Sequence, residues 1–252
     1  MKKIILGILA VALLSGCGSN LKLTPEPQKG QKKVFNNGNE VVVSSKRSSV
    51  LLSSLTPTYK SNTKPKIFIG LKNRTSKSFN FSTENVQAFV DGKPHKIYTY
   101  EELADEIETS KKWAAVGAAL SGMGRSMSAA NAGTTYHSGT YNSSSYNTYG
   151  TNSYSSGSYS GYSYNSAATQ QARDASNAQT QADFKAIKDK EQASLNSING
   201  VVRKTTISPN RFYSGTIVLE SMENPKETHT LNMVVTLGNE KHNFILKNYQ
   251  VK

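Results

Sequence analysis

The sequence predicts a mainly β protein, an immunoglobulin-like antiparallel β-sandwich that is interrupted by an antiparallel helical hairpin. Two observations support this fold class. Short β-branched and aromatic runs bounded by turn residues fill 34–98 and 201–252, which is typical of antiparallel sheets. Between them, 99–132 and 167–200 repeat apolar residues at threes and fours, as helices do. Strands on both sides of one insertion indicate a single β-sandwich domain.

Residues 1–16 have the composition of a signal peptide. Lys2 and Lys3 precede an apolar run of 11 residues from Ile4 to Leu14, and a basic region followed by a hydrophobic one is the pattern of an export signal. A permanent membrane-spanning helix needs about 20 residues. We therefore expect this segment to be removed.

The single cysteine of the chain, Cys17, follows that run. The stretch Leu14-Ser15-Gly16-Cys17 resembles the lipobox of bacterial lipoproteins. This resemblance implies lipidation of the Cys17 thiol by a diacylglycerol, cleavage before Cys17, and a lipid anchor in the membrane of the cell envelope. The absence of an aspartate directly after the cysteine implies delivery to the outer membrane, if the organism has two membranes. The alternative is an ordinary signal peptide with a chance cysteine.

Composition limits the classes of partner. The net charge is +13, so an exported protein of this kind most simply meets anionic lipid headgroups, glycan or peptidoglycan. General solubility is the alternative explanation of the charge, and no nucleic-acid partner is expected outside the cytoplasm. Because Cys17 is the only cysteine, no intramolecular disulfide can form, and stability has to come from packing.

The first part of the mature chain is predicted to be a lipidated tether over 17–33, because Pro25 and Pro27 lie in a polar, basic stretch without apolar periodicity. Extended, it would reach roughly 50 Å. The strand pattern begins after it, and Ile67, Ile69 and Leu71 alternate with polar or opposite-facing residues as in a central strand. We expect strands at 40–43, 49–55, 66–72, 79–81, 85–90, 96–98, 201–207, 212–219, 229–237 and 241–246.

Turn and cap signals delimit these elements. Asp91-Gly92 and Gly238-Asn239 each predict a two-residue hairpin turn. Thr99-Tyr100-Glu101-Glu102 matches a capping box, in which the Thr99 hydroxyl and the Glu102 carboxylate each bond an exposed amide. A helix should therefore begin at Thr99.

Each predicted helix carries an apolar stripe. The first contains Leu103, Ile107, Trp113, Val116, Leu120, Met123 and Met127, and the second contains Phe184, Ile187, Leu195 and Ile198. We expect Trp113, Val116 and Leu120 to pack near Phe184 or Ile187, because burial of both stripes removes large side chains from water. The alternative is that the uncharged segment 113–124, with its Ala118-x-x-x-Gly122 spacing, acts on a membrane or in self-assembly.

Residues 133–166 are rich in Ser, Tyr, Gly and Asn, and tyrosines at 136, 141 and 146 recur 13 residues later at 149, 154 and 159. Such a composition offers no continuous apolar face, so we expect a disordered loop. The alternative is an adhesive segment whose tyrosines stack on sugars or on other copies of the chain.

No pattern in the chain indicates catalysis. We interpret His95, His137, His229 and His242 as surface residues, since no pair has the spacing of metal ligands. No Ser stands in a nucleophile-elbow context and no glycines form a phosphate loop. We expect a non-enzymatic, lipid-anchored envelope protein without cofactor, metal or catalytic residue. Its β-sandwich and helical arm would bind an envelope protein or self-associate; binding of glycan or peptidoglycan by a basic, Tyr-rich surface is a weaker hypothesis.

Overall fold

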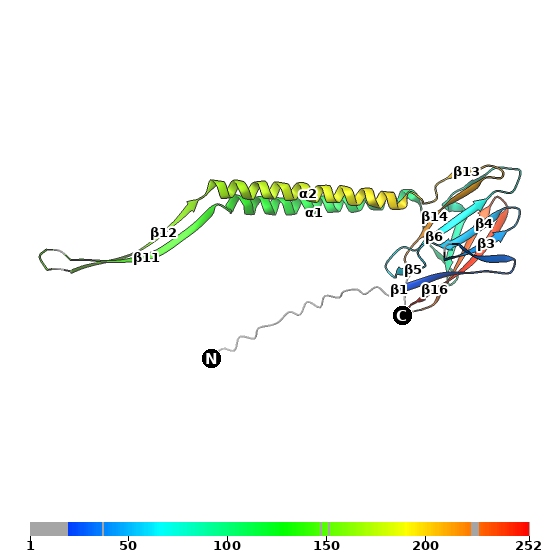
Figure 1. Ribbon diagram of the computed structural model, residues 1–252, viewed down its shortest axis with the longest axis horizontal. Helices are drawn as coiled ribbons and strands as arrows, with labels where there is room; N and C mark the ends of the chain where they lie inside the picture. Colours follow the sequence, from blue (N-terminus) through cyan, green and yellow to red (C-terminus); the bar gives the residue numbers. More distant parts are fainter. Residues whose placement is uncertain (1–19, 37, 147, 151, 223–226, 252) are drawn as a thin grey trace, which may run out of the picture. The chain divides into compact units, whose positions relative to one another are not determined.

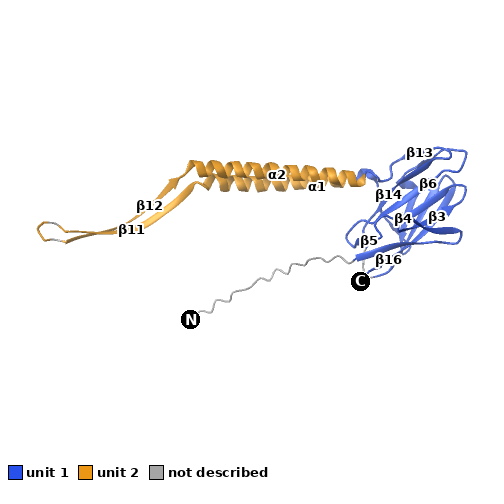
Figure 2. Ribbon diagram, viewed as in Figure 1, with its two compact units in different colours: residues 1–103, 199–252 blue, residues 104–198 orange. Residues whose placement is uncertain are grey.

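The computed structural model of the protein describes residues 20–36, 38–146, 148–150, 152–222 and 227–251 (Figure 1). The chain forms two compact units (Figure 2). One contains the residues up to 103 together with those from 199 onward, and the other contains 104–198. Both flanks of the insertion therefore belong to one unit, and the fold class predicted from the sequence is confirmed.

The first unit is built from antiparallel sheets. In the described residues, one six-stranded sheet has the spatial order β5 (Thr58–Lys60), β1 (Asn20–Glu26), β16 (Glu240–Gln250), β15 (His229–Leu237), β8 (Val86–Val90) and β9 (Lys93–His95). The other has the order β10 (Ile97–Tyr98), β14 (Phe212–Leu219), β6 (Lys66–Lys72), β4 (Ser49–Ser54), β3 (Asn39–Ser45) and β2 (Gln31–Asn36). A two-stranded sheet pairs β13 (Thr205–Ile207) with β7 (Phe79–Phe81), and the short 3-10 helix η1 (Thr83–Asn85) precedes β8.

The core lies between the two large sheets. Leu21 and Phe244 come from one sheet and Leu52, Ile69 and Ile217 from the other, and each is at most 1% exposed. The predicted central strand is confirmed as β6, which lies between β14 and β4. Its alternation arises because successive side chains of a strand point to opposite faces.

The predicted hairpin turns are also confirmed. Val90 pairs with Lys93 and Leu237 with Glu240, so each turn has two residues. Asp91 and Gly92 both have positive φ, 49° and 82°, as a type I′ turn requires.

The predicted tether over 17–33 is wrong for most of its length. Strand β1 begins at Asn20, and β2 begins at Gln31. Leu21 and Leu23 lie in the core and alternate with exposed or half-buried polar residues. This period-two pattern is short, because β1 has only seven residues. Pro25 is tolerated because β5 pairs only with Asn20, Leu21 and Lys22, so the missing N–H of Pro25 faces no neighbouring strand on that side.

The second unit consists of two helices and a β-hairpin. Helices α1 (Tyr100–Asn131) and α2 (Ser166–Ile198) run side by side (Figure 1). The capping box is confirmed, because the Glu102 N–H donates to Thr99 Oγ1 at 3.1 Å and the Thr99 N–H donates to Glu102 Oε2 at 2.9 Å. The Thr99 amide, followed by the Lys96 ammonium, lowers the pKa of Glu102.

The expected disorder of 133–166 is not what the structure shows. Strands β11 (Thr134–Tyr146) and β12 (Asn152–Tyr164) pair along their whole length. Tyr141 lies opposite Gly157, and Tyr159 lies opposite Gly139. Each ring lies so close that a Cβ on the glycine would fall 2.6 to 2.8 Å from ring atoms. Tyrosine thus covers glycine across the strands, a source of order that composition does not reveal.

Candidate interaction surface

The seam between α1 and α2 is made of small and polar side chains. Gly122 is buried, and a Cβ there would lie 3.1 Å from Thr180 Oγ1. Ala129 of α1 and Thr169 and Ser176 of α2 are also buried. Small residues let two helix backbones approach closely. This part of the seam is therefore packed by small side chains.

Ion pairs supply part of the contact between the helices. Arg125 Nη2 lies 2.6 Å from Asp183 Oδ2 and donates to Thr180 Oγ1 at 3.3 Å. Nearer the other end of the seam, Lys111 Nζ lies 2.8 Å from Glu191 Oε1. A hydrogen bond from the Gln179 amide, and then the one from Arg125, lower the pKa of Asp183. The seam thus depends on charge as well as on close backbone packing.

Five large apolar side chains of α1, all from Trp113 onward, are at least half exposed. Trp113 is 73% exposed, Val116 50%, Leu120 64%, Met123 64% and Met127 68%. The expectation that Trp113, Val116 and Leu120 pack against α2 is therefore wrong. We call these five residues the α1 stripe.

The second helix explains this outcome. On α2, Phe184 is 43% exposed, whereas Ile187 lines a shallow cavity with Ile107 and Ala114. Opposite the middle of α1, the positions of α2 that contact it include Thr180 and Asp183, which are polar, and Ser176 is buried nearby. These polar positions do not offer an apolar surface of their own to the α1 stripe. The polar residues Ser176, Thr180 and Asp183, spaced by four and three, are the signal in the sequence that could have revealed the outward direction of the α1 stripe.

The β11–β12 hairpin forms a second exposed surface. Tyr136 and Tyr162 pair across the strands with ring centroids 5.1 Å apart. Within the described residues these two strands form a sheet of their own, so each has one edge without a neighbouring strand. The chain between Arg125 and Arg173 contains no Asp, Glu, Lys or Arg. Long, uncharged strand edges are templates for pairing with another chain.

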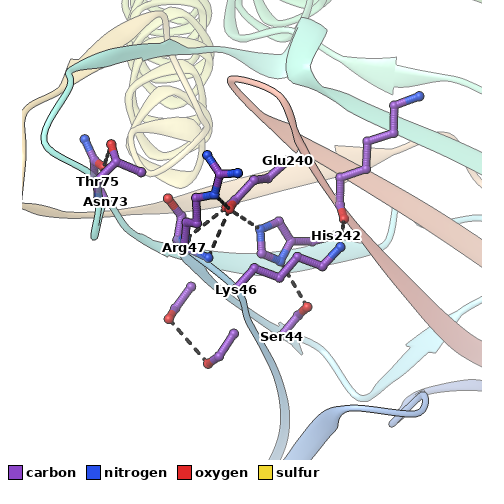
Figure 3. Close-up of polar contacts among 11 residues, drawn as sticks. Ser44, Lys46, Arg47, Asn73, Thr75, Glu240 and His242 are labelled. Atoms are coloured by element: carbon purple, nitrogen blue, oxygen red, sulfur yellow. Dashed lines mark hydrogen bonds and ion pairs between the residues drawn. The ribbon is translucent and has the colours of Figure 1, made fainter.

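Two histidines interpreted as surface residues are buried. His242 is 0% exposed and shares a 3.0 Å hydrogen bond between its Nδ1 and Ser44 Oγ (Figure 3). Its Nε2 lies 3.7 Å from Glu240 Oε2, and the same carboxylate accepts the backbone N–H groups of Arg47 and Ser48. Burial, followed by the nearby Lys46, lowers the pKa of His242. This cluster ties the β3–β4 turn to the start of β16.

The other buried histidine, His229, lies 2.6 Å from Asp91 through Nδ1 and Oδ2. Asp91 also accepts the Thr230 N–H at 2.8 Å, and these two hydrogen bonds, that from Thr230 being the larger effect, lower the pKa of Asp91. The pair fixes the β8–β9 turn to β15. Of the remaining histidines, His95 is half-buried and His137 is exposed.

Among the residues that the structure describes, no three His, Cys, Asp or Glu side chains are arranged to hold a metal ion. No helix in this part of the chain is long and apolar enough to cross a membrane. The predicted lipidation residue, Cys17, lies outside the described residues.

Comparison with known proteins bears on the N-terminus alone. Residues 1–17 match the family model of the prokaryotic membrane lipoprotein lipid attachment site. This is a lipid-anchored protein of the cell envelope. The lipoprotein matches no curated protein and no solved structure. What its mature domain does is therefore inferred from its own residues and contacts.

Proposed function

We propose that this lipoprotein is a non-enzymatic, self-assembling envelope protein, in which 104–198 binds the same residues of a second copy. The observation that carries the proposal is the exposed α1 stripe. Its five side chains follow one another at intervals of 3, 4, 3 and 4 residues, which is the spacing of the a and d positions in a left-handed coiled coil. An equivalent stripe on a second copy would interdigitate with it.

The charge pattern of this surface suits association of identical partners. No Asp, Glu, Lys or Arg lies between Lys112 and Arg125, so two copies of this part of the α1 stripe bring no like charges together. The residues beside the stripe include Gly117, Ala119 and Gly124, and small flanking residues allow a second helix to approach closely.

The β11–β12 hairpin supports the same partner. Its strands are 13 residues long, and their outer edges present unpaired backbone N–H and C=O groups that a strand of a second copy would satisfy. It contains no lysine or glutamate of the kind that blocks edge pairing in other proteins. The absence of Lys and Arg also separates the tyrosines from the basic residues in sequence, which weakens the hypothesis of a basic, Tyr-rich glycan-binding surface.

Lipid anchoring favours the association further. Attachment at Cys17 confines all copies to one membrane leaflet, and confinement raises the effective concentration of one copy around another. A modest intrinsic affinity is then enough for assembly. A lipid surface is the other possible occupant of the α1 stripe, and the experiment below separates the two.

The test is disulfide cross-linking of the intact lipoprotein in membranes. Met123→Cys places a thiol in the α1 stripe, and Cys17 does not compete because its sulfur carries the lipid. In a parallel pair, the Cα atoms of equivalent stripe residues lie within the separation that a disulfide requires, roughly 4.4 to 6.8 Å. We expect oxidation to yield a covalent dimer from Met123→Cys and little from Ser121→Cys, an exposed matched control outside the stripe. Equal cross-linking of both variants, or of neither, would contradict the proposal.

A further inference from the structure

The link between the lipid and the folded domain is very short. Only Gly18 and Ser19 separate Cys17 from Asn20, the first residue of β1. Three Cα–Cα steps of 3.8 Å span about 11 Å at most. Since the acyl chains on Cys17 lie in the bilayer, the start of β1 stays within about 11 Å of the Cys17 Cα at the membrane surface.

This end of the sheet is held firmly. Asn20 pairs with Lys60 of β5, and the Val251 N–H donates to the Asn20 carbonyl at 2.9 Å. Beneath the surface, buried Tyr59 donates to Asn248 Oδ1 at 2.8 Å and so fixes β5 to β16 across β1. The position of the anchor is therefore transmitted to three strands.

Lysines lie on the outer face of this edge. Lys22 and Lys60 are exposed. In the β1–β5 pair, Lys22 lies opposite Thr58 and Lys60 lies opposite Asn20, so the two lysines are diagonal neighbours across the strands. Lys22 also pairs with Tyr249 of β16, and half-buried Lys247, two residues before it, donates to Thr230 Oγ1. The acid of β1, Glu26, is at the opposite end of the strand, about 20 Å from Asn20 at 3.3 Å per residue. Asp91 is close enough to Lys247 to be affected by its charge.

We propose that the outer face of the β1–β5 edge, with Lys22 and Lys60, binds the anionic headgroups of the membrane that holds the lipid anchor. Both lysines lie close to Asn20, the end of β1 that the link holds near the bilayer. Lys22 is two residues after Asn20 along β1, and Lys60 lies opposite Asn20 on β5. Surface charges act over a Debye length of about 8 Å at physiological salt, so headgroups are within their range. Tyr249 adds an amphipathic ring of the kind favoured at membrane interfaces.

The test uses the full-length lipidated protein in vesicles of phosphatidylcholine alone or mixed with phosphatidylglycerol, with a quencher on the headgroups. Thr58→Cys carries a fluorophore at this edge, opposite Lys22. Asn243→Cys carries the same fluorophore on an exposed residue of β16, toward the other end of the same sheet. We expect stronger quenching at 58 than at 243, and a further increase at 58 alone when phosphatidylglycerol is present.

Charge removal completes the experiment. Lys22→Gln with Lys60→Gln should abolish the increase that phosphatidylglycerol causes at 58, whereas Lys32→Gln with Lys241→Gln, two exposed lysines elsewhere in the domain, should retain it. Circular dichroism verifies that each variant is folded. Equal quenching at both sites would overturn the proposed orientation. Quenching at 58 that is the same with and without phosphatidylglycerol would overturn the assignment of headgroup binding to the lysines.

Discussion

Replacement of Leu120 by aspartate tests the proposed assembly most directly. The side chain of Leu120 is 64% exposed and makes no part of the seam with α2. Leu120→Asp should therefore leave the folded copy nearly intact, at a cost of about 0.5 kcal/mol from helix propensity. In an assembled pair, by contrast, it would place a charge in the centre of the α1 stripe.

The magnitude follows from the exposed fraction. Full burial of a leucine side chain contributes about 1.5 to 3 kcal/mol, so the 64% that remains exposed in one copy corresponds to about 1 to 2 kcal/mol. A symmetric pair loses this twice, about 2 to 4 kcal/mol in all. That loss weakens dimerisation by about 30-fold to 700-fold. Desolvation of the carboxylate adds to it.

The assay is sedimentation velocity over a concentration series of the mature chain without its lipid. Ser121→Asp is the matched control, because it adds the same charge one residue away at an exposed position outside the stripe. We expect Leu120→Asp to shift the dimerisation curve to higher concentration and Ser121→Asp to leave it near that of the parent. A parent that sediments as a monomer at every concentration, or two variants that shift it equally, would refute the reasoning.

Three further predictions concern the anchor, the domain and a buried histidine. Cys17→Ser should prevent incorporation of a fatty-acid analogue in metabolic labelling; label retained by the variant would contradict lipidation at Cys17. Replacement of 104–198 by a short Gly/Ser linker should leave a β-domain that unfolds cooperatively on heating, because both sheets of the core belong to the other unit; loss of any thermal transition would argue against this. Because burial lowers the pKa of His242 below its usual 6.5, the unfolded chain takes up the proton first. The free energy of unfolding should then be undiminished above pH 6.5 and fall, by up to about 1.4 kcal/mol per pH unit, as pH drops from 6.5 to the lowered pKa. Urea titrations between pH 7.5 and 5 would show a smaller fall for His242→Gln, and an unchanged fall would contradict the assignment.

Local signals in the sequence were sufficient where the chemistry is local. The capping box at Thr99, the turn at Asp91-Gly92 and the alternation of Ile67, Ile69 and Leu71 each depend on neighbouring residues, and the structure has all three. The predicted tether failed because two prolines outweighed the short alternation of β1. Pro25 is compatible with β1 because β5 begins at Thr58, opposite Lys22, and does not extend alongside Pro25. That boundary is information about a distant part of the chain.

The candidate surface was harder to predict because it depends on what a side chain does not contact. The apolar periodicity of α1 is plain in the sequence, yet its direction depends on α2, whose inner positions include the polar Ser176 and Thr180. Likewise, the order of the hairpin depends on a cross-strand register that sets Tyr141 over Gly157. The composition shows that tyrosine and glycine are both abundant, but it does not show which tyrosine lies opposite which glycine.

The uncharged stretch between Arg125 and Arg173 also affects how the protein meets proteases. It contains no Lys or Arg, so enzymes with trypsin-like specificity have no cleavage site in the whole β11–β12 hairpin. Its eight tyrosines, all at least 53% exposed, are instead the side chains that chymotrypsin-like enzymes accept. Tryptic digestion will therefore release this segment as a single long peptide. An enzyme that cuts after aromatic residues will cleave the hairpin faster when its strand edges are open than when another chain covers them.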